Sequence, residues 1–236
     1  FHDQKRFLGW GFKGSTPQLL VAPHQREKAL QHLDELLAKQ TSNRKDWERL
    51  LGVLRSLVPG IAGSKGQFSV MQEGISKGKN RVKVRGQIRH QLRTMRSLVA
   101  STSRPSSMYE LVPGPPPYTG ATDAAKAGMG GVWFIADGEA LLWRAPFPAD
   151  VQAQLVSYKN PSGKITNSDL ELLATIAHHH VLEEAGYPMA GESTHTFSDN
   201  TPAVAWQNKG SATTTTVTAD LLRHSALHQR ATGHVP

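Results

Sequence analysis

The sequence has no cysteine, which excludes disulfide bonds and thiolate metal sites but does not assign a compartment. It also has no run of about 18 uncharged apolar residues, so no segment is expected to span a membrane. The start of the chain, Phe1 to Arg6, lacks both a methionine and the apolar core of a signal peptide. These absences predict an intracellular fragment of a longer polypeptide, with no membrane partner.

Acidic residues are nearly missing from one part of the chain. Residues 1–63 contain 10 Lys or Arg against 6 Asp or Glu, residues 64–104 contain 10 against 1, and residues 105–236 contain 7 against 12. The net charges of the three blocks are therefore +4, +9 and −5, within a total of +8. A strongly basic block ahead of an acidic one indicates a nucleic-acid partner. The alternative is a basic surface that is simply solvated.

Eight cations fall within the twenty residues from 77 to 96. They are Lys77, Lys79, Arg81, Lys83, Arg85, Arg89, Arg93 and Arg96. If this run follows a phosphate backbone, its affinity for nucleic acid should fall steeply with salt. No aromatic residue lies among these cations, so contact with a duplex backbone is favoured over stacking on single-stranded bases. A solvated face or a disordered connector remains as the alternative.

Helical periodicity dominates the first half of the chain. Apolar residues recur at helical spacing after Pro23 and again from Trp47, which predicts a pair of helices that ends at Pro59-Gly60. A third helix is predicted over residues 86–100, with an almost wholly cationic exposed face. The chain before these helices is predicted to form a short hairpin, with arms at 7–12 and 19–21 and a turn at 14–17.

The proline-rich segment 112–117 cannot continue a helix or a central strand, because proline donates no amide hydrogen bond, and we place a domain boundary there. Beyond it we expect turns at Gly128 to Gly131 and at Asp137-Gly138, and a long helix with Ser168 as its N-cap and Gly186 as its terminator. The predicted strands cover 118–124, 130–137, 140–145 and 194–198, and the predicted helices cover 168–185, 201–208 and 215–230. This order predicts an α/β domain with a mixed sheet flanked by helices.

Three carboxylates occupy related places in that arrangement. Asp123 lies near the middle or end of the first predicted strand, Glu171 in the first turn of the long helix, and Asp199 at the end of the fourth strand. If the first and fourth strands are neighbours, the two aspartates converge, and the helix can bring Glu171 to the same point. Three carboxylates repel one another unless cations hold them, and oxygen ligands suit Mg²⁺ or Mn²⁺. The pattern indicates a two-metal site for phosphodiester hydrolysis.

Each of these residues also has an ordinary structural role open to it. Asp123 could be a turn aspartate, Glu171 a partner of the helix dipole, and Asp199 an N-cap of the following helix. Histidines offer a second metal hypothesis, but consecutive helical positions such as His178 to His180 point about 100° apart. His224 and His228 have i, i+4 spacing without an evident third ligand, so a solvated helix face is favoured for them.

Several motifs resemble those of retroelement reverse transcriptases. Residues 122–133, TDAAKAGMGGVW, look like the first-strand motif of RNase H domains, and residues 167–174, NSDLELLA, are similar to the motif of the helix that supplies the glutamate. Residues 198–206, SDNTPAVAW, with Asn208 to Ser211, resemble the third motif, especially that of DIRS-type retrotransposons. Upstream, Phe7 to Trp10 look like the end of a polymerase palm, and Trp47 to Leu54 with Phe68 resemble thumb helices. These motifs cover nearly the whole chain in the order of the family.

The resemblance implies an endonuclease that cuts the RNA strand of an RNA–DNA hybrid, with Asp123, Glu171 and Asp199 as catalytic metal ligands. It also implies that the palm motif carrying the polymerase aspartates precedes Phe1, so no DNA synthesis is expected. The family places a fourth acidic residue after a fifth strand, whereas this sequence stops at Gly233 to Pro236. The domain is therefore expected to be truncated, and a catalytically inactive or repurposed remnant that binds nucleic acid or a protein is the alternative.

The resemblance divides the chain into four parts and implies partners for them. The rest of the polyprotein or a second copy could complete the sheet. The expected parts are the end of a palm-like hairpin (1–22), a helical basic thumb or connection-like segment (23–104), a proline-rich linker (105–117) and an RNase H-like α/β domain (118–236).

Overall fold

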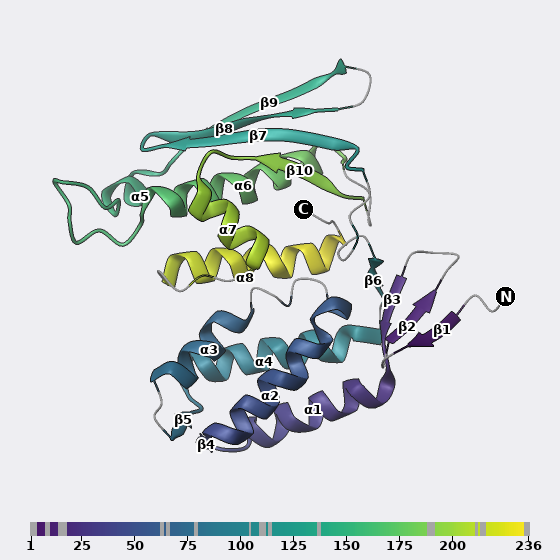
Figure 1. Cartoon of the computed structure of the whole chain (residues 1–236). Helices are drawn as coiled ribbons and strands as arrows, with labels where there is room; N and C mark the ends of the chain where they lie inside the picture. The colour runs from purple at the N-terminus through teal and green to yellow at the C-terminus, as the bar shows by residue number, and fades with distance from the viewer. Residues whose placement is uncertain are drawn as a thin grey trace. The chain divides into compact units, whose positions relative to one another are not determined.

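The computed structural model forms two compact units, Phe1–Val112 and Pro113–Pro236, which are described separately (Figure 1). The division falls within the proline-rich segment 105–117. None of the described helices is long and apolar enough to cross a bilayer. The described residues are 4–7, 10–13, 18–61, 64, 67–77, 80–103, 105–108, 112, 115–135, 138–187, 192–210, 212 and 216–233.

The first unit is mainly helical. Its α-helices are α1 (Pro23–Leu37), α2 (Arg44–Leu57), α3 (Phe68–Lys77) and α4 (Gly86–Ala100), with short 3-10 turns at Val58–Gly60 and Ser101–Ser103. Three of the helices, α1, α2 and α4, match the expected ones, whereas α3 was not predicted. Their core surrounds Trp47, which is fully buried and whose indole N–H donates to the Met71 carbonyl at 2.9 Å.

Two small sheets complete the first unit. One has the strand order β1-β2-β3-β6, and its strands are β1 (Gln4–Phe7), β2 (Trp10–Lys13), β3 (Gln18–Val21) and β6 (Ser106–Ser107). Strand β3 confirms the expected return strand. The arm expected at 7–12 is wrong as a single strand, because Phe7 ends β1 and lies opposite Trp10 of β2 in an antiparallel pair. The turn predicted at 14–17 lies outside the described residues. The other sheet pairs β4 (Thr41–Asn43) with β5 (Arg81–Lys83) in antiparallel fashion, so the basic β5 lies beside the start of α2.

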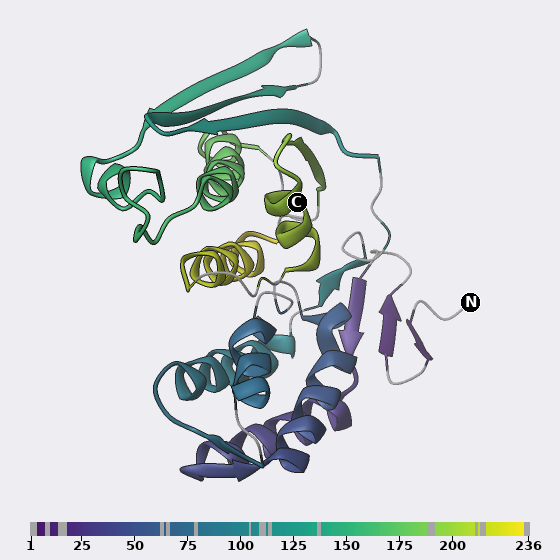
Figure 2. The ribbon, with the colours of Figure 1, turned by 60° about the vertical axis from the view of Figure 1, so that its left-hand side comes forward.

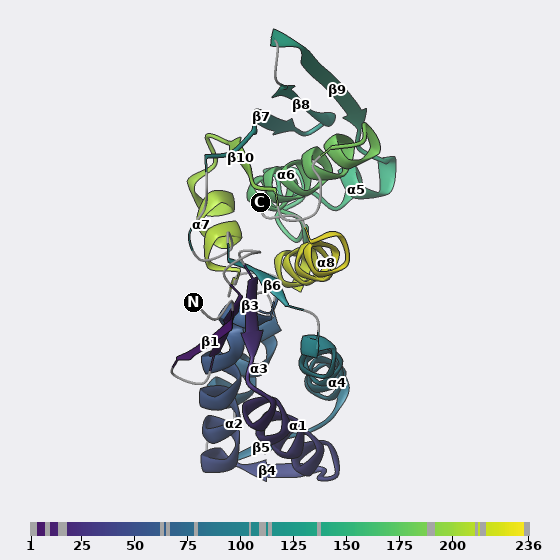
Figure 3. The same cartoon turned by 90° about the vertical axis from the view of Figure 1, so that its right-hand side faces the viewer.

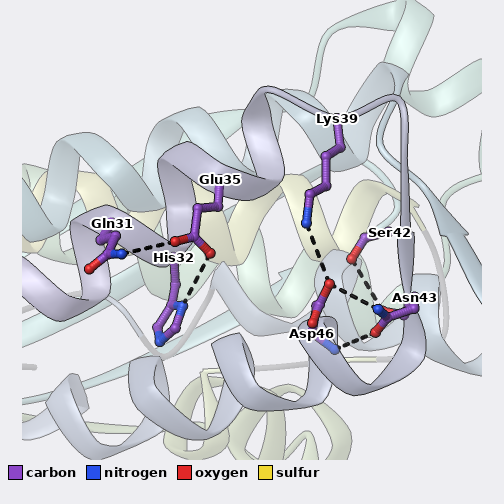
Figure 4. Close-up of polar contacts among 7 residues, drawn as sticks. All are labelled: Gln31, His32, Glu35, Lys39, Ser42, Asn43 and Asp46. Atoms are coloured by element: carbon purple, nitrogen blue, oxygen red, sulfur yellow. Dashed lines mark hydrogen bonds and ion pairs between the residues drawn. The ribbon is translucent and has the colours of Figure 1, made fainter.

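The start of α2 is held by a polar network that includes Lys39, just beyond the end of α1 (Figure 4). The Asn43 side chain accepts a hydrogen bond from the backbone N–H of Asp46 at 2.7 Å, and its amide donates to the Asp46 carboxylate at 3.0 Å. Lys39, just beyond α1, lies 3.5 Å from that carboxylate. The cap satisfies a free helix N–H, whereas the exposed ion pair contributes little to stability.

The second unit contains a four-stranded mixed sheet with the order β10-β7-β8-β9. Its strands are β7 (Tyr118–Ala125), β8 (Gly128–Phe134), β9 (Ala140–Pro146) and β10 (Thr194–Phe197). Its helices are α5 (Ala149–Ala153), α6 (Asn167–Glu184), α7 (Thr201–Lys209) and α8 (Thr216–Thr232). Strands β7, β8 and β9 are antiparallel, and β10 is parallel to β7. This confirms the predicted α/β fold class, a mixed sheet flanked by helices and preceded by a mainly helical segment.

Helix α6 lies between the sheet and α8, and α7 lies on the same side of the sheet (Figures 2 and 3). The helix is accordingly buried on more than one side, as expected for a helix without a continuous polar stripe. Its Leu170 and Ala174 pack with Phe147 and Leu155, while Leu172 joins an apolar cluster with residues of α7 and α8. The position of α6 is thus fixed by the sheet side and by the layer of α7 and α8.

Two local predictions in the second unit are wrong. The N-cap of α6 is Thr166 rather than Ser168, because Thr166 forms a reciprocal capping box with Asp169. The glycine-rich segment from Gly128 to Gly131 is not a turn but part of β8. A side chain at Gly131 would place its Cβ 2.6 Å from the Ala121 carbonyl and 2.8 Å from a His178 nitrogen, so glycine is needed for close approach rather than for a bend.

The ends of the helices and hairpins agree better with expectation. Gly186 follows the end of α6 with a φ of +91°, in the left-handed region that favours glycine. Gly138, in the connection between β8 and β9, has a φ of +81°. Its predicted turn partner, Asp137, lies outside the described residues.

Candidate metal centre

The two aspartates occupy equivalent positions near the C-terminal ends of neighbouring parallel strands. Strand β7 pairs with β10 so that Ala121 lies opposite Phe197. Asp123 and Asp199 each come two residues after one of these partners, and both are exposed. Parallel strands end at the same edge of a sheet, so the register brings the two carboxylates to one place. The predicted convergence of the first and fourth strands is confirmed.

Glu171 reaches the same place from the helix layer. It lies in the second turn of α6, which packs against β7 and β8, and it is only 2% exposed. One oxygen each of Asp123, Glu171 and Asp199 lie within 4.8 Å of one another. The three residues predicted from the sequence are therefore brought together, with a buried carboxylate between two exposed ones.

The surroundings of Glu171 disfavour a negative charge. Burial, reinforced by the neighbouring Asp123 carboxylate, raises the pKa of Glu171 from 4.5 to about 7, although a hydrogen bond from the Ala124 backbone N–H opposes the rise. Its Oε2 atom is buried and has no hydrogen-bond partner among the described residues. A buried carboxylate oxygen without a donor, beside two further carboxylates, is an environment that a cation satisfies.

This donor set fits a hard divalent cation. All three side chains offer oxygen, which Mg²⁺ and Mn²⁺ prefer over the nitrogen and sulfur ligands typical of zinc. The two exposed aspartates leave one side of the cluster accessible to water or to a phosphate. The cluster therefore meets the chemical requirements of a carboxylate metal centre that is open to a substrate.

The ordinary structural roles considered for these residues do not match the structure. Asp123 lies within β7, opposite Gly130, and not in a turn. The N-cap of α7 is Asn200, whose side chain accepts from the backbone N–H of Ala203, so Asp199 is not the cap. Asp169, and not Glu171, is the acidic residue of the first turn of α6.

The basic run from 77 to 96 divides into engaged and exposed cations. Arg89 donates to the carbonyls of Leu37 and Lys39, both at 3.0 Å, and thereby closes the end of α1. Arg96 forms a two-point contact with Asp34 at 2.5 and 3.1 Å, and this contact lowers the pKa of the Asp34 carboxyl. These two arginines therefore have structural partners within the first unit.

The remaining predicted cations include four with exposed side chains and no hydrogen bond or ion pair among the described residues. These are Arg81 and Lys83 on β5, Arg85 at the start of α4, and Arg93 on α4. Of the other two, Lys79 lies outside the described residues, and Lys77 ends α3 with a side chain that is also outside them. We call the four exposed cations the basic face.

The three consecutive histidines point in different directions, as expected from helical geometry. His178 is fully buried against the sheet: Trp133 stacks on it at 3.9 Å, and the Trp143 indole N–H donates to its Nδ1 at 2.7 Å. Burial lowers the pKa of His178 to about 3, so this ring is neutral. His179 contacts Thr196 of β10, whereas His180 lies beside His224 and His228 of α8.

The contact with α8 corrects part of one prediction: His224 is exposed, as expected of a solvated helix face, whereas His228 is partly buried. The sequence offered no third ligand for this pair, but His180 and Glu183 of α6 lie beside His228. The signal was present as the i, i+3 spacing of His180 and Glu183. It could not be used, because nothing local indicates that these two helices pack together.

Comparison with known proteins gives matches only among solved structures. No protein-family model matches the sequence, and no curated protein matches it. A foamy viral protease-reverse transcriptase dRH in complex with double-stranded DNA is similar over 97% of this chain and 36% of that chain, at 11% identity and a TM-score of 0.40. The foamy viral protease-reverse transcriptase in complex with an RNA/DNA hybrid is similar over 94% of this chain and 28% of that chain, at 9% identity and a TM-score of 0.35. This chain thus spans about a third of those chains, and likeness of this degree does not transfer function.

Proposed function

We propose that the second unit is a ribonuclease of the RNase H type, which hydrolyses the RNA strand of an RNA–DNA hybrid with Mg²⁺ or Mn²⁺. The observation that carries the proposal is the meeting of Asp123, Glu171 and Asp199, within 4.8 Å, from two parallel strands and the helix beneath them. The choice of a hybrid substrate rests on the resemblance of residues 122–133, 167–174 and 198–206 to retroelement RNase H motifs. Derivation from a DIRS-type reverse transcriptase is part of the same proposal.

The three carboxylates would hold the cation, which when bound makes water a stronger nucleophile and stabilises the oxygen that leaves phosphorus. Hydrolysis adds one water across a P–O bond of the RNA backbone. The exposed Asp123 and Asp199 face the side from which a phosphate can approach. Glu171 closes the opposite side, where burial excludes water and makes its uncompensated charge costly.

The first unit would hold the nucleic acid through the basic face, Arg81, Lys83, Arg85 and Arg93. Their exposed positions on β5 and α4 suit contact with phosphates, and such contact is independent of base sequence. In this proposal residues 23–104 act as a thumb or connection-like segment and residues 1–22 as the end of a palm-like hairpin. In this proposal the first unit binds the duplex and the second unit hydrolyses it.

The test is cleavage of an RNA–DNA hybrid labelled on either strand, in the presence of Mg²⁺. We expect products from the RNA strand only, and a loss of at least about 100-fold for Asp123→Asn or Asp199→Asn, the scale on which removing one charge-stabilising group lowers catalysis. Asp150→Asn is the matched control, since Asp150 is exposed on α5 and lies outside the carboxylate cluster. Its activity should equal that of the unaltered chain.

Binding measured on the same hybrid separates the alternatives. Salt-dependent binding without any cleavage at high protein concentration would reject the nuclease and support a nucleic-acid-binding remnant. The observation that favours this second function is the basic face. Cleavage that survives Asp123→Asn would reject the proposed site. Absence of both binding and cleavage would reject both functions.

A further inference from the structure

A second group of metal-ligating side chains lies where α6 packs against α8. His180 and Glu183 are one turn apart on α6, and His228 faces them from α8. One nitrogen from each imidazole and one Glu183 oxygen lie within 4.8 Å of one another. All three residues are partly buried, so the group is neither a solvated surface nor a sealed core.

Both imidazoles are directed at the same carboxylate oxygen. The Nδ1 atom of His180 lies 3.7 Å from Glu183 Oε2, and Nε2 of His228 forms a short contact with that atom. The rings of His180 and His228 are also close to each other, with centroids 4.0 Å apart. In a tetrahedral zinc site with bonds of 2.0–2.1 Å, ligand atoms lie roughly 3.3 Å apart. The 3.7 Å between His180 Nδ1 and Glu183 Oε2 is near that value, and the three candidate ligand atoms lie within 4.8 Å of one another.

A simple charged pair explains this arrangement less well than a metal ion does. One protonated histidine would pair with Glu183, but the second ring, whose centroid lies 4.0 Å from the first, would then lie directly beside a cation. A single cation can be shared by both rings and the carboxylate, because each contributes one lone pair.

The nature of the donors separates this group from the cluster of Asp123, Glu171 and Asp199. Two imidazole nitrogens and one carboxylate suit zinc, whereas three carboxylates suit Mg²⁺. Three protein ligands leave one tetrahedral position open. His224 lies nearby, with its ring centroid 5.7 Å from that of His180.

We propose that His180, Glu183 and His228 bind a Zn²⁺ ion that joins α8 to α6. The ligands come from two helices, and Glu183 and His228 are separated by 45 residues in the sequence. An ion there would link the C-terminal half of α8 to the helix that carries Glu171. The site does not depend on the nuclease proposal, because it shares no residue with the carboxylate cluster.

The test is calorimetric titration of the full chain with Zn²⁺, after chelator treatment and in excess Mg²⁺, which occupies carboxylate sites. We expect one equivalent to bind. Loss of a group that merely orients a metal ligand costs about 10- to 100-fold in affinity, so His228→Gln or Glu183→Gln should cost at least about 100-fold. His24→Gln, an exposed histidine of the first unit, should leave binding unchanged.

A measurement without mutation guards against variants that fail to fold. In ¹⁵N-labelled protein, one equivalent of Zn²⁺ should shift the ring nitrogens of His180 and His228, while the ring of the buried His178 stays unchanged. The proposal is overturned if no equivalent binds in excess Mg²⁺, if a well-folded His228→Gln binds as tightly as the parent, or if other histidines shift instead.

Discussion

Replacing Glu171 by glutamine should stabilise the metal-free protein at high pH while abolishing the proposed activity. Glu171 is 2% exposed, and its pKa is raised from 4.5 to about 7. A tenfold change in proton affinity corresponds to about 1.4 kcal/mol, so ionising this carboxyl in the folded protein costs roughly 3 kcal/mol. Glutamine keeps the shape of the protonated group and can accept the hydrogen bond from Ala124, but it never ionises.

The sign of the pH dependence follows from the raised pKa. The folded protein binds the Glu171 proton more tightly than the unfolded chain does, so this residue's contribution to stability is fully present below about pH 4.5. It is lost as the pH rises through about 7. Glu171→Gln should therefore equal the parent in stability near pH 4 and exceed it by up to roughly 3 kcal/mol at pH 8.

The assay is hydrogen exchange of peptides from α6 across a urea series, with EDTA, at the two pH values. This readout follows the second unit alone, which matters because a two-unit chain need not unfold in one step. Glu184→Gln, an exposed position on the same helix, should show no such gain. Millimolar Mg²⁺ should stabilise the parent at pH 8 and the Glu171→Gln variant far less. An equal gain at both pH values, or none at pH 8, would refute the buried-carboxylate reasoning.

Two further predictions concern nucleic-acid binding and packing. Replacing the cations of the basic face with glutamine should reduce the slope of log affinity against log salt by about 0.9 for each duplex phosphate that the protein then leaves unneutralised, as followed by fluorescence anisotropy. The altered residues are Arg81, Lys83, Arg85 and Arg93. The control replaces an exposed set of equal charge, Lys28, Lys45, Arg49 and Arg55, and should leave the slope nearly unchanged. Gly131→Ala should lower the unfolding free energy by about 1–3 kcal/mol, because its Cβ would overlap Ala121 and His178. Gly52→Ala should instead raise the unfolding free energy by up to about 1 kcal/mol, because a Cβ at this exposed position in the middle of α2 meets nothing within 4 Å. Chemical denaturation of the two variants should therefore shift in opposite directions, and a Gly131→Ala variant as stable as the parent would show that crowding at Gly131 is unimportant.

Local pattern determined much of this protein in advance. The period of the apolar residues predicts α1, α2 and α4, and the prolines of 112–117 mark the division between units. Asp123 and Asp199 could be selected because the first lies near the end of a recognisable strand and the second just after one. These features depend on neighbours a few residues away, which is the range over which periodicity and turn chemistry act.

Tertiary structure decided the rest, because the deciding contacts join distant residues. Only the parallel register of β7 with β10 places Asp123 level with Asp199, and only the packing of α6 against the sheet buries Glu171 and raises its pKa. The glycines of β8 are required by backbone and side chains across the sheet and not by a turn. The meeting of His180 and Glu183 with His228 likewise exists only because α8 lies on α6. A local pattern can present a side chain, but long-range packing selects its neighbours and its charge.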